Sequence, residues 1–180
     1  MRRLISAALP IVALAACSSA DLNTGPSSPE SAPTAGHPAP ASVQGPRPLT
    51  GSCTTVVTRL APPPIEVQRI EYTCRLAHLG LTHAVVTQTV DVATGTLSST
   101  GVYTAANGDE LSASFTGTAV LSFTDPADAT VTFEGTQVFS AGTGRFADAS
   151  GTAHLAGSAR INLITGSGTG EFTLHGTLTY

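Results

Sequence analysis

The chain has 180 residues, of which 41% are hydrophobic, 11% are charged and 5% are aromatic. Charged residues usually make up about a quarter of a globular chain, so this chain is weakly charged, with a formal net charge of −4 and no lysine. Because it has no basic cluster that could neutralise phosphates, we expect no nucleic-acid partner. The length suits one modest domain together with additional segments.

The N-terminal residues have the pattern of an export signal. Arg2 and Arg3 precede an apolar stretch, Leu4–Ala16, that is interrupted only by one serine and one proline. Its 13 residues are too few to cross a bilayer as a helix, which takes about 20 residues. A stretch of this length is typical of the apolar region of a secretory signal peptide.

The apolar stretch ends in Leu14-Ala15-Ala16-Cys17-Ser18, which resembles the lipobox of bacterial lipoproteins. The resemblance implies that residues 1–16 are removed as a signal peptide and that Cys17 carries a diacylglycerol. Two or three acyl chains anchor a protein durably, since each buried CH₂ contributes about 0.8 kcal/mol. We therefore expect lipid anchoring in the bacterial cell envelope, on the outer membrane where the host has one, with the folded domain outside the cytoplasm. The alternative is an ordinary signal peptide, cleaved after residues 18–20, in which Cys17 is incidental.

Residues 17–48 are predicted to form a tether. Of the 31 residues in 18–48, seven are proline, and most of the rest are Ser, Ala, Gly and Thr. This composition cannot bury enough apolar surface to offset chain entropy. Prolines at this density favour extended segments of about 3.1 Å per residue, so the maximum reach of the tether is about 100 Å.

Residues 49–180 are predicted to form an all-β domain, because apolar and polar residues alternate there with a period of two between turn signals. In 111–123, for example, every second residue from Leu111 to Phe123 is apolar or glycine. Asn107-Gly108 favours a tight hairpin with a type I′ turn. The expected strands cover 52–60, 65–77, 81–92, 97–104, 111–123, 131–139, 153–163 and 172–178, and a helical turn is expected over 145–149.

Eight strands with glycines at inward positions, such as Gly117, Gly157 and Gly176, favour a closed antiparallel β-barrel. Glycine relieves crowding where strands bend, and closure removes exposed sheet edges. A two-sheet sandwich is the alternative architecture. A transmembrane barrel is disfavoured, because the outward residues are mostly Thr and Ser rather than apolar.

Four short segments occur in order along the predicted domain: Asn-Gly-Asp-Glu-Leu at 107–111, Phe-Thr-Gly-Thr at 115–118, Phe-Glu-Gly-Thr at 133–136 and Gly-Thr-Gly-Arg-Phe-Ala at 142–147. Together they resemble bacterial members of the allene oxide cyclase and dirigent-like barrel superfamily, over about residues 81–180. The resemblance implies the eight-stranded barrel fold. The plant enzymes of that superfamily bind an unstable apolar substrate in the barrel and steer its reaction. None of their catalytic residues matches a residue of this chain, so activity does not carry over.

Cys53 and Cys74 are predicted to form a disulfide. Their positions are symmetric about the triple proline at 62–64, so a hairpin centred there places the two thiols opposite each other. Disulfides persist in export compartments. The alternatives are two buried free thiols or a redox pair, although no Cys-x-x-Cys motif is present.

No catalytic constellation, cofactor motif or metal site is predicted. Zinc needs three or four clustered ligands, whereas the histidines are scattered; only His154 and His175 could meet, on adjacent strands. The polar residues expected inside the barrel, and therefore the candidate cavity-lining residues, are Tyr72, Gln88, Tyr103 and Gln137.

Three functions are consistent with these patterns. The first is a non-enzymatic, lipid-anchored barrel that binds a small apolar ligand or contacts another envelope component. The second is an isomerase or cyclase that confines an apolar substrate, which predicts an open cavity with Tyr72 or Tyr103 exposed to it. The third is a structural or adhesive module with a packed interior. The sequence does not determine the oligomeric state.

Overall fold

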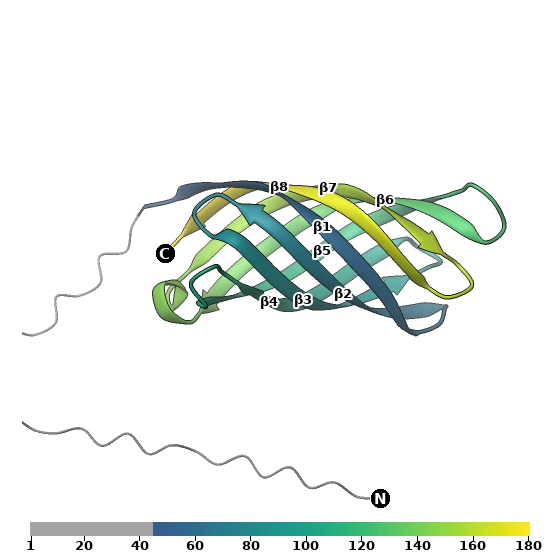
Figure 1. The fold of residues 1–180 in the computed structure, drawn as a ribbon, viewed down its shortest axis with the longest axis horizontal. Coiled ribbons are helices and arrows are strands. Elements are labelled where there is room, and N and C mark those ends of the chain that lie inside the picture. The colour runs from purple at the N-terminus through teal and green to yellow at the C-terminus, as the bar shows by residue number, and fades with distance from the viewer. Residues whose placement is uncertain (1–44) are drawn as a thin grey trace, which may run out of the picture. The chain divides into compact units, whose positions relative to one another are not determined.

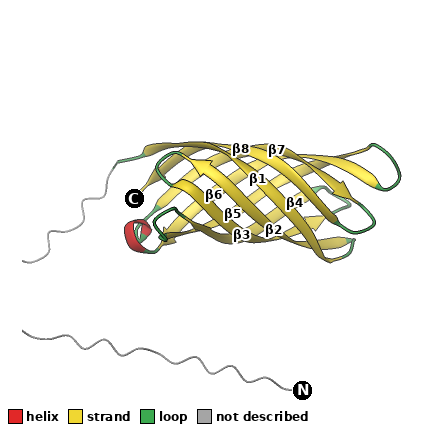
Figure 2. Cartoon of the chain, viewed as in Figure 1, coloured by secondary structure: helices red, strands yellow, loops and turns green. Residues whose placement is uncertain are grey.

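The structure is a computed structural model that describes residues 45–180. Each strand pairs antiparallel with the next, and β1 pairs with β8, which closes an eight-stranded barrel (Figure 1 and Figure 2). This confirms the predicted barrel rather than the sandwich. The proposed signal peptide, Cys17 and nearly all of the tether lie outside the described residues. The elements are β1 (Arg47–Ala61), β2 (Ile65–Leu76), β3 (Gly80–Asp91), β4 (Thr96–Thr104), β5 (Glu110–Phe123), β6 (Asp128–Gly142), the 3₁₀ helix η1 (Gly144–Phe146), β7 (Ser150–Asn162) and β8 (Ser167–Thr179).

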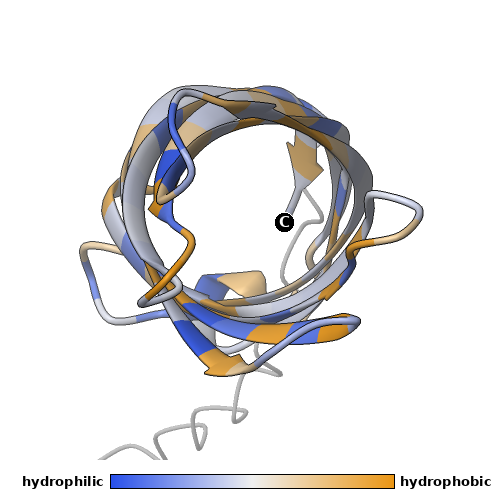
Figure 3. Cartoon of the chain, turned by 90° about the vertical axis from the view of Figure 1, so that its right-hand side faces the viewer, coloured by the Kyte–Doolittle hydropathy of each residue, from blue (hydrophilic) through white to orange (hydrophobic). Residues whose placement is uncertain are grey.

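The strands form because alternate residues suit two different environments. In β2, Ile70, Tyr72 and Cys74 are buried in the barrel, while Glu71 and Thr73 between them are exposed. The same alternation continues around the barrel, with threonine and serine at most outward positions. Figure 3 shows these alternating hydrophobic and hydrophilic residues along the barrel wall. A period of two places one residue class inside and the other outside.

The first strand begins earlier than the sequence predicted. It starts at Arg47 rather than Ser52, so it includes the last two residues of the predicted tether. The reason is closure, since β1 pairs with β8 from Arg47 to Thr58 and buries Leu49. Pro48 is tolerated because pairing with β2 starts only at Gly51, which leaves one side of β1 unpaired there.

The hairpin at Asn107-Gly108 joins β4 and β5 as predicted, but its turn is not type I′. A type I′ turn needs positive φ at both central residues, and only Gly108 has it, with φ of 87°. The Gly108 amide donates to the Ala105 carbonyl, and the Ala105 amide donates to the Asp109 carbonyl. The loop is therefore wider than a two-residue turn, with Gly108 in the left-handed conformation that glycine tolerates.

The two ends of the barrel differ. We call the end formed by the loops after β1, β3, β5 and β7 the proline end, because Pro62–Pro64 lie in the first of these loops. The opposite, N-terminal end carries the start of β1, η1 and Tyr180. Buried loop residues fill the N-terminal end: Leu79, Ala105, Phe146 and Ala149. The η1 turn fixes Phe146 there, with its ring centroid 5.0 Å from that of Tyr180.

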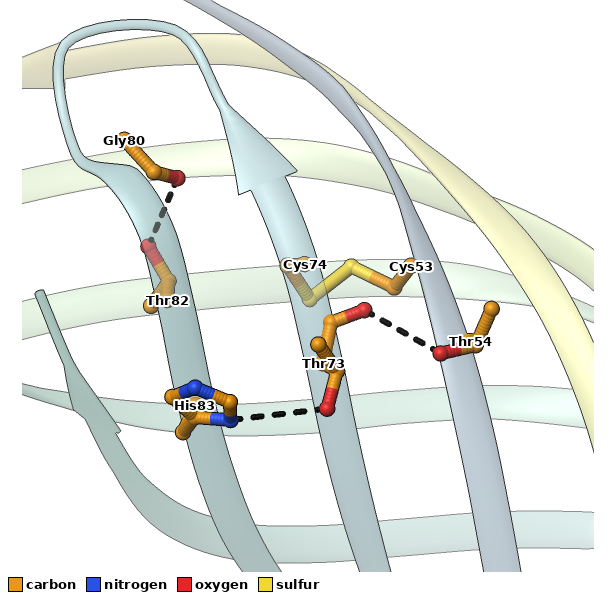
Figure 4. The surroundings of a disulfide bond; sticks show 7 residues. All are labelled: Cys53, Thr54, Thr73, Cys74, Gly80, Thr82 and His83. Atoms are coloured by element: carbon orange, nitrogen blue, oxygen red, sulfur yellow. Dashed lines mark hydrogen bonds between the residues drawn. A yellow bond between two sulfur atoms is a disulfide. The ribbon is translucent and has the colours of Figure 1, made fainter. Parts of the chain in front are cut away.

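Cys53 and Cys74 form the predicted disulfide inside the barrel. They are partners in the β1–β2 register, and both are buried. Figure 4 shows the bond crossing between the two strands, with Thr54 donating a hydrogen bond to the Thr73 carbonyl beside it. The hairpin symmetry about the triple proline therefore determines the pairing.

Within residues 45–180, no helix is long and apolar enough to cross a membrane.

Candidate functional site

A cavity of about 150 Å³ lies inside the barrel, in the half that ends at the proline end. Its lining residues on β1 run from Thr55 to Arg59, and those on β2 run from Glu66 to Tyr72. Thr55 and Tyr72 are partners in the register and lie furthest from the proline end, so they belong to the floor. The apolar wall includes Val57, Ile70, Val90, Leu97, Phe115, Leu155, Ala159 and Ile161.

Aromatic side chains fill the barrel below the cavity floor. The Tyr72 ring packs edge-on against Phe172 at 4.9 Å between centroids, and Tyr103 packs against Phe139 at 5.7 Å. Edge-to-face pairs at these distances are favourable beyond the area that they bury. This aromatic packing forms the floor of the cavity, and a ligand can enter the cavity from the proline end.

The four predicted cavity-lining residues lie in two different places. Tyr72 and Gln88 line the cavity. Tyr103, which is fully buried, and Gln137 lie outside its lining, in the packed interior. The Gln137 amide Nε2 donates to the Ser114 carbonyl oxygen at 3.0 Å, so this side chain stabilises the β5–β6 pair. The sequence identified inward positions but not their height along the barrel.

Burial raises the pKa of the Tyr72 phenol well above its usual value. The pKa of Tyr103 is raised in the same direction, first by burial and then by the neighbouring Tyr72 phenol. Burial disfavours the charged form of a phenol. Tyr72 therefore faces the cavity as a neutral hydroxyl that can donate or accept a hydrogen bond, and it is not a phenolate base near neutral pH.

An ion pair at the cavity mouth was missed by sequence reasoning. Arg59 Nε lies 3.0 Å from Glu66 Oε1, and Arg59 Nη2 donates to Glu66 Oε2 at 3.2 Å. Arg59 Nη1 also donates to the Leu163 carbonyl at 3.0 Å, which links β1 to the loop between β7 and β8. Both charged side chains are mostly buried, with exposures of 18% and 7%.

Two glutamines extend this network across β2 and β3. Gln68 Nε2 donates to Glu66 Oε1 at 2.8 Å, and Gln88 Nε2 donates to Gln68 Oε1 at 3.4 Å. The signal for Glu66 and Gln68 was present in the sequence. Both share the parity of Ile70 and Tyr72, just as Arg59 shares the parity of Cys53 and Val57. Continuing each inward set to the end of its strand would have found all three.

Exposed apolar side chains surround the mouth. They lie at strand ends or in loops of the proline end: Leu60, Ile65, Val92, Phe123 and Ile164. Phe123, which the alternation places on the inward face, is 69% exposed because the barrel wall ends before it can enclose this side chain. Val92 follows the end of β3 and lines the cavity, although it is 41% exposed.

His154 and His175 do meet as register partners on β7 and β8. The nearest carboxylate contact places Glu134 Oε2 3.9 Å from His154 Nε2. Within residues 45–180, no group of three His, Cys, Asp or Glu side chains has the arrangement needed to hold a metal ion. These histidines are exposed on the outer wall, away from the cavity.

Comparisons with protein-family models, with curated proteins and with solved structures found no match to this chain.

Proposed function

We propose that this protein is a lipid-anchored protein of the bacterial cell envelope whose barrel binds a small apolar molecule without chemically changing it. The observation that carries the binding role is the cavity of about 150 Å³ with its mostly apolar wall. Engineered apolar cavities of about this volume stay dry and bind benzene. An unfilled apolar space inside a barrel is costly to keep, so a cavity is more readily explained by a ligand than by stability.

The mouth supports the same function. The apolar side chains at the proline end, such as Phe123 and Ile164, are exposed and offer an apolar surface beside the entrance to the cavity. Exposed apolar patches commonly mark binding surfaces. A purely structural or adhesive module predicts a fully packed interior, which fits this barrel less well.

The envelope location rests on the sequence. The lipobox-like segment ending at Cys17 and the proline-rich tether support export and anchoring. The buried Cys53–Cys74 disulfide is compatible with both, because disulfides persist in oxidising compartments.

A second function, an isomerase or cyclase, is favoured by one observation, which is that Tyr72 lines the cavity. The resemblance to allene oxide cyclases and dirigent-like proteins suggests the same kind of chemistry. A cavity of about 150 Å³ is below the range of about 300–1,000 Å³ that is usual for ligand pockets. It therefore limits such a substrate to a size near one six-membered ring.

Native mass spectrometry of the protein purified gently from its own envelope, after removal of the lipid anchor, tests the binding function. We expect a discrete added mass in the native spectrum that is absent after denaturation. Ala159→Leu fills part of the cavity, since Ala159 lines it, and should remove the added mass without unfolding the barrel. A bare polypeptide mass in repeated native preparations would contradict the proposal. Turnover that is lost in Tyr72→Phe would instead establish the enzymatic alternative.

A further inference from the structure

Two cavity-lining residues have a buried polar atom with no hydrogen-bond partner within the described residues, Arg59 Nε and the Thr55 hydroxyl. Arg59 Nε lies 3.0 Å from Glu66 Oε1 in the ion pair, so Thr55 is the one of the two without a charged neighbour of its own. The Thr55 hydroxyl is buried, has no hydrogen-bond partner within the described residues, and belongs to a residue that is 4% exposed. Thr55 lines the cavity, and its neighbour on the β8 side is Gly170, which has no side chain to offer. An unsatisfied buried hydroxyl usually costs about 1–3 kcal/mol. Valine has the same shape without that cost.

The charges at the cavity are already neutralised. Arg59 and Glu66 form a two-contact ion pair, and the remaining polar groups at the mouth are the amides of Gln68 and Gln88. An ionised ligand that enters the cavity would lose its hydration without gaining a free counter-charge, which is strongly unfavourable. The cavity therefore favours neutral molecules over acids and amines.

We propose that the cavity binds a neutral molecule near the size of one six-membered ring, which carries one hydroxyl or carbonyl group hydrogen-bonded to Thr55. This inference rests on the proposed binding function and specifies the ligand class. The apolar body packs against Ile70, Phe115 and Leu155, while its polar group reaches the floor. The volume of about 150 Å³ excludes long acyl chains, since a cavity of that size holds about one benzene ring.

Three probes of similar shape separate the effects of a hydroxyl group and of a charge on binding. Toluene has no polar group, phenol has a neutral hydroxyl, and benzoate has a charge. The protein is the full chain carrying Cys17→Ala, produced under oxidising conditions so that the Cys53–Cys74 bond forms. Dissociation constants are measured by NMR titration. We expect phenol to bind about three- to tenfold more tightly than toluene, as one net hydrogen bond supplies, and benzoate to bind more weakly than both.

Thr55→Val is the decisive variant, because it removes the hydroxyl and keeps the shape. It should reduce phenol binding about three- to tenfold, leave toluene binding unchanged, and raise the urea midpoint of the free protein. Thr58→Val, on the exposed face of the same strand, is the matched control and should change none of these values.

The outcomes separate this inference from the proposed function. If phenol and toluene bind equally to wild type and to Thr55→Val, the role of Thr55 is wrong while apolar binding stands. Tighter binding of benzoate than of phenol would overturn the preference for neutral ligands. If none of the three probes binds, the cavity is not a binding site and both proposals fail.

Discussion

Arg59 and Glu66 face each other inside the mouth of the barrel and make two contacts, at 3.0 Å and 3.2 Å. They lie on either side of the triple proline, among the last residues of β1 and the first residues of β2. Because Arg59 also bonds the Leu163 carbonyl, the pair connects two loops of the proline end. The two charges at the cavity mouth neutralise each other, so the ion pair leaves no net charge there.

The ion pair can be tested by a double-mutant cycle. Glu66→Leu leaves Arg59 without its partner in a mostly buried place, and the free energy of unfolding should fall by about 3–5 kcal/mol. The double variant Arg59→Met and Glu66→Leu should recover most of this loss, because burying no charge is often as stable as burying a pair. Urea denaturation of the wild type, Arg59→Met, Glu66→Leu and the double variant measures the coupling energy between the two side chains. Additive losses would show that the two side chains do not interact.

Reduction of the Cys53–Cys74 bond should lower the free energy of unfolding by about 3 kcal/mol, the value for a closed loop of about 22 residues. Urea unfolding with and without reductant measures this difference. Both cysteines are buried, at 3% and 0% exposure, so we also expect the native bond to resist reductant until the barrel opens. Rapid reduction of the folded protein would contradict the buried placement.

Gly117 and Gly135 are opposite each other on β5 and β6, and the Phe115 ring covers both. A Cβ on Gly117 would lie 2.6 Å from the Phe115 ring and closer still to the Glu134 carbonyl oxygen. Gly117→Ala should therefore cost about 1–3 kcal/mol of stability through overpacking. Thermal unfolding measures the effect, with Ser114→Ala on the outward face of β5 as the control. An unchanged melting temperature of Gly117→Ala would show that β5 and β6 leave room for a Cβ at this position.

The two buried tyrosines predict alkaline sensitivity. The pKa of Tyr72 and of Tyr103 is raised by burial in the folded protein, whereas in the unfolded chain it is about 10. The stabilisation is complete below pH 10 and is lost as the pH rises above it. Each tyrosine then reduces the free energy of unfolding by about 1.4 kcal/mol per pH unit.

Absorbance at 295 nm and urea unfolding between pH 9 and pH 11 measure this loss. In the folded protein, Tyr72 and Tyr103 should stay protonated and ionise only as the barrel unfolds. Ionisation of Tyr72 and Tyr103 near pH 10 without unfolding would contradict the packed interior.

If Cys17 carries the proposed lipid anchor, Cys17→Ala should move the protein from the membrane fraction to the soluble fraction, because buried acyl chains would supply the anchoring energy. Ser18→Ala, which keeps Cys17, is the matched control and should stay in the membrane fraction. Fractionation followed by immunoblotting distinguishes them. A Cys17→Ala variant that fractionates like wild type would show that Cys17 carries no anchor.

Much of the fold could be predicted because its determinants are local. The alternation in β5 from Leu111 to Leu121 reflects a period of two that any half-buried strand must follow. The disulfide pairing followed from hairpin symmetry, which needs only positions along the chain.

The turn at Gly108 and the exposure of Phe123 could not be predicted in this way. They depend on loop geometry and on where the closed wall ends. The candidate site was predicted in part for a related reason, since parity places Tyr72, Gln88, Tyr103 and Gln137 inward without saying which share a cavity.

The sequence by itself determined which residues face inward, where the strands turn and which cysteines pair, because these depend on spacing along one or two neighbouring strands. Only the tertiary structure decided that pairing with β8 extends β1 back to Arg47, that Phe146 and Tyr180 fill one end, and that the other end stays hollow. Closure sets the stagger of all eight strands together. That stagger decides which inward side chains share a level, so it places Thr55 and Tyr72 at a cavity and Tyr103 in a packed core.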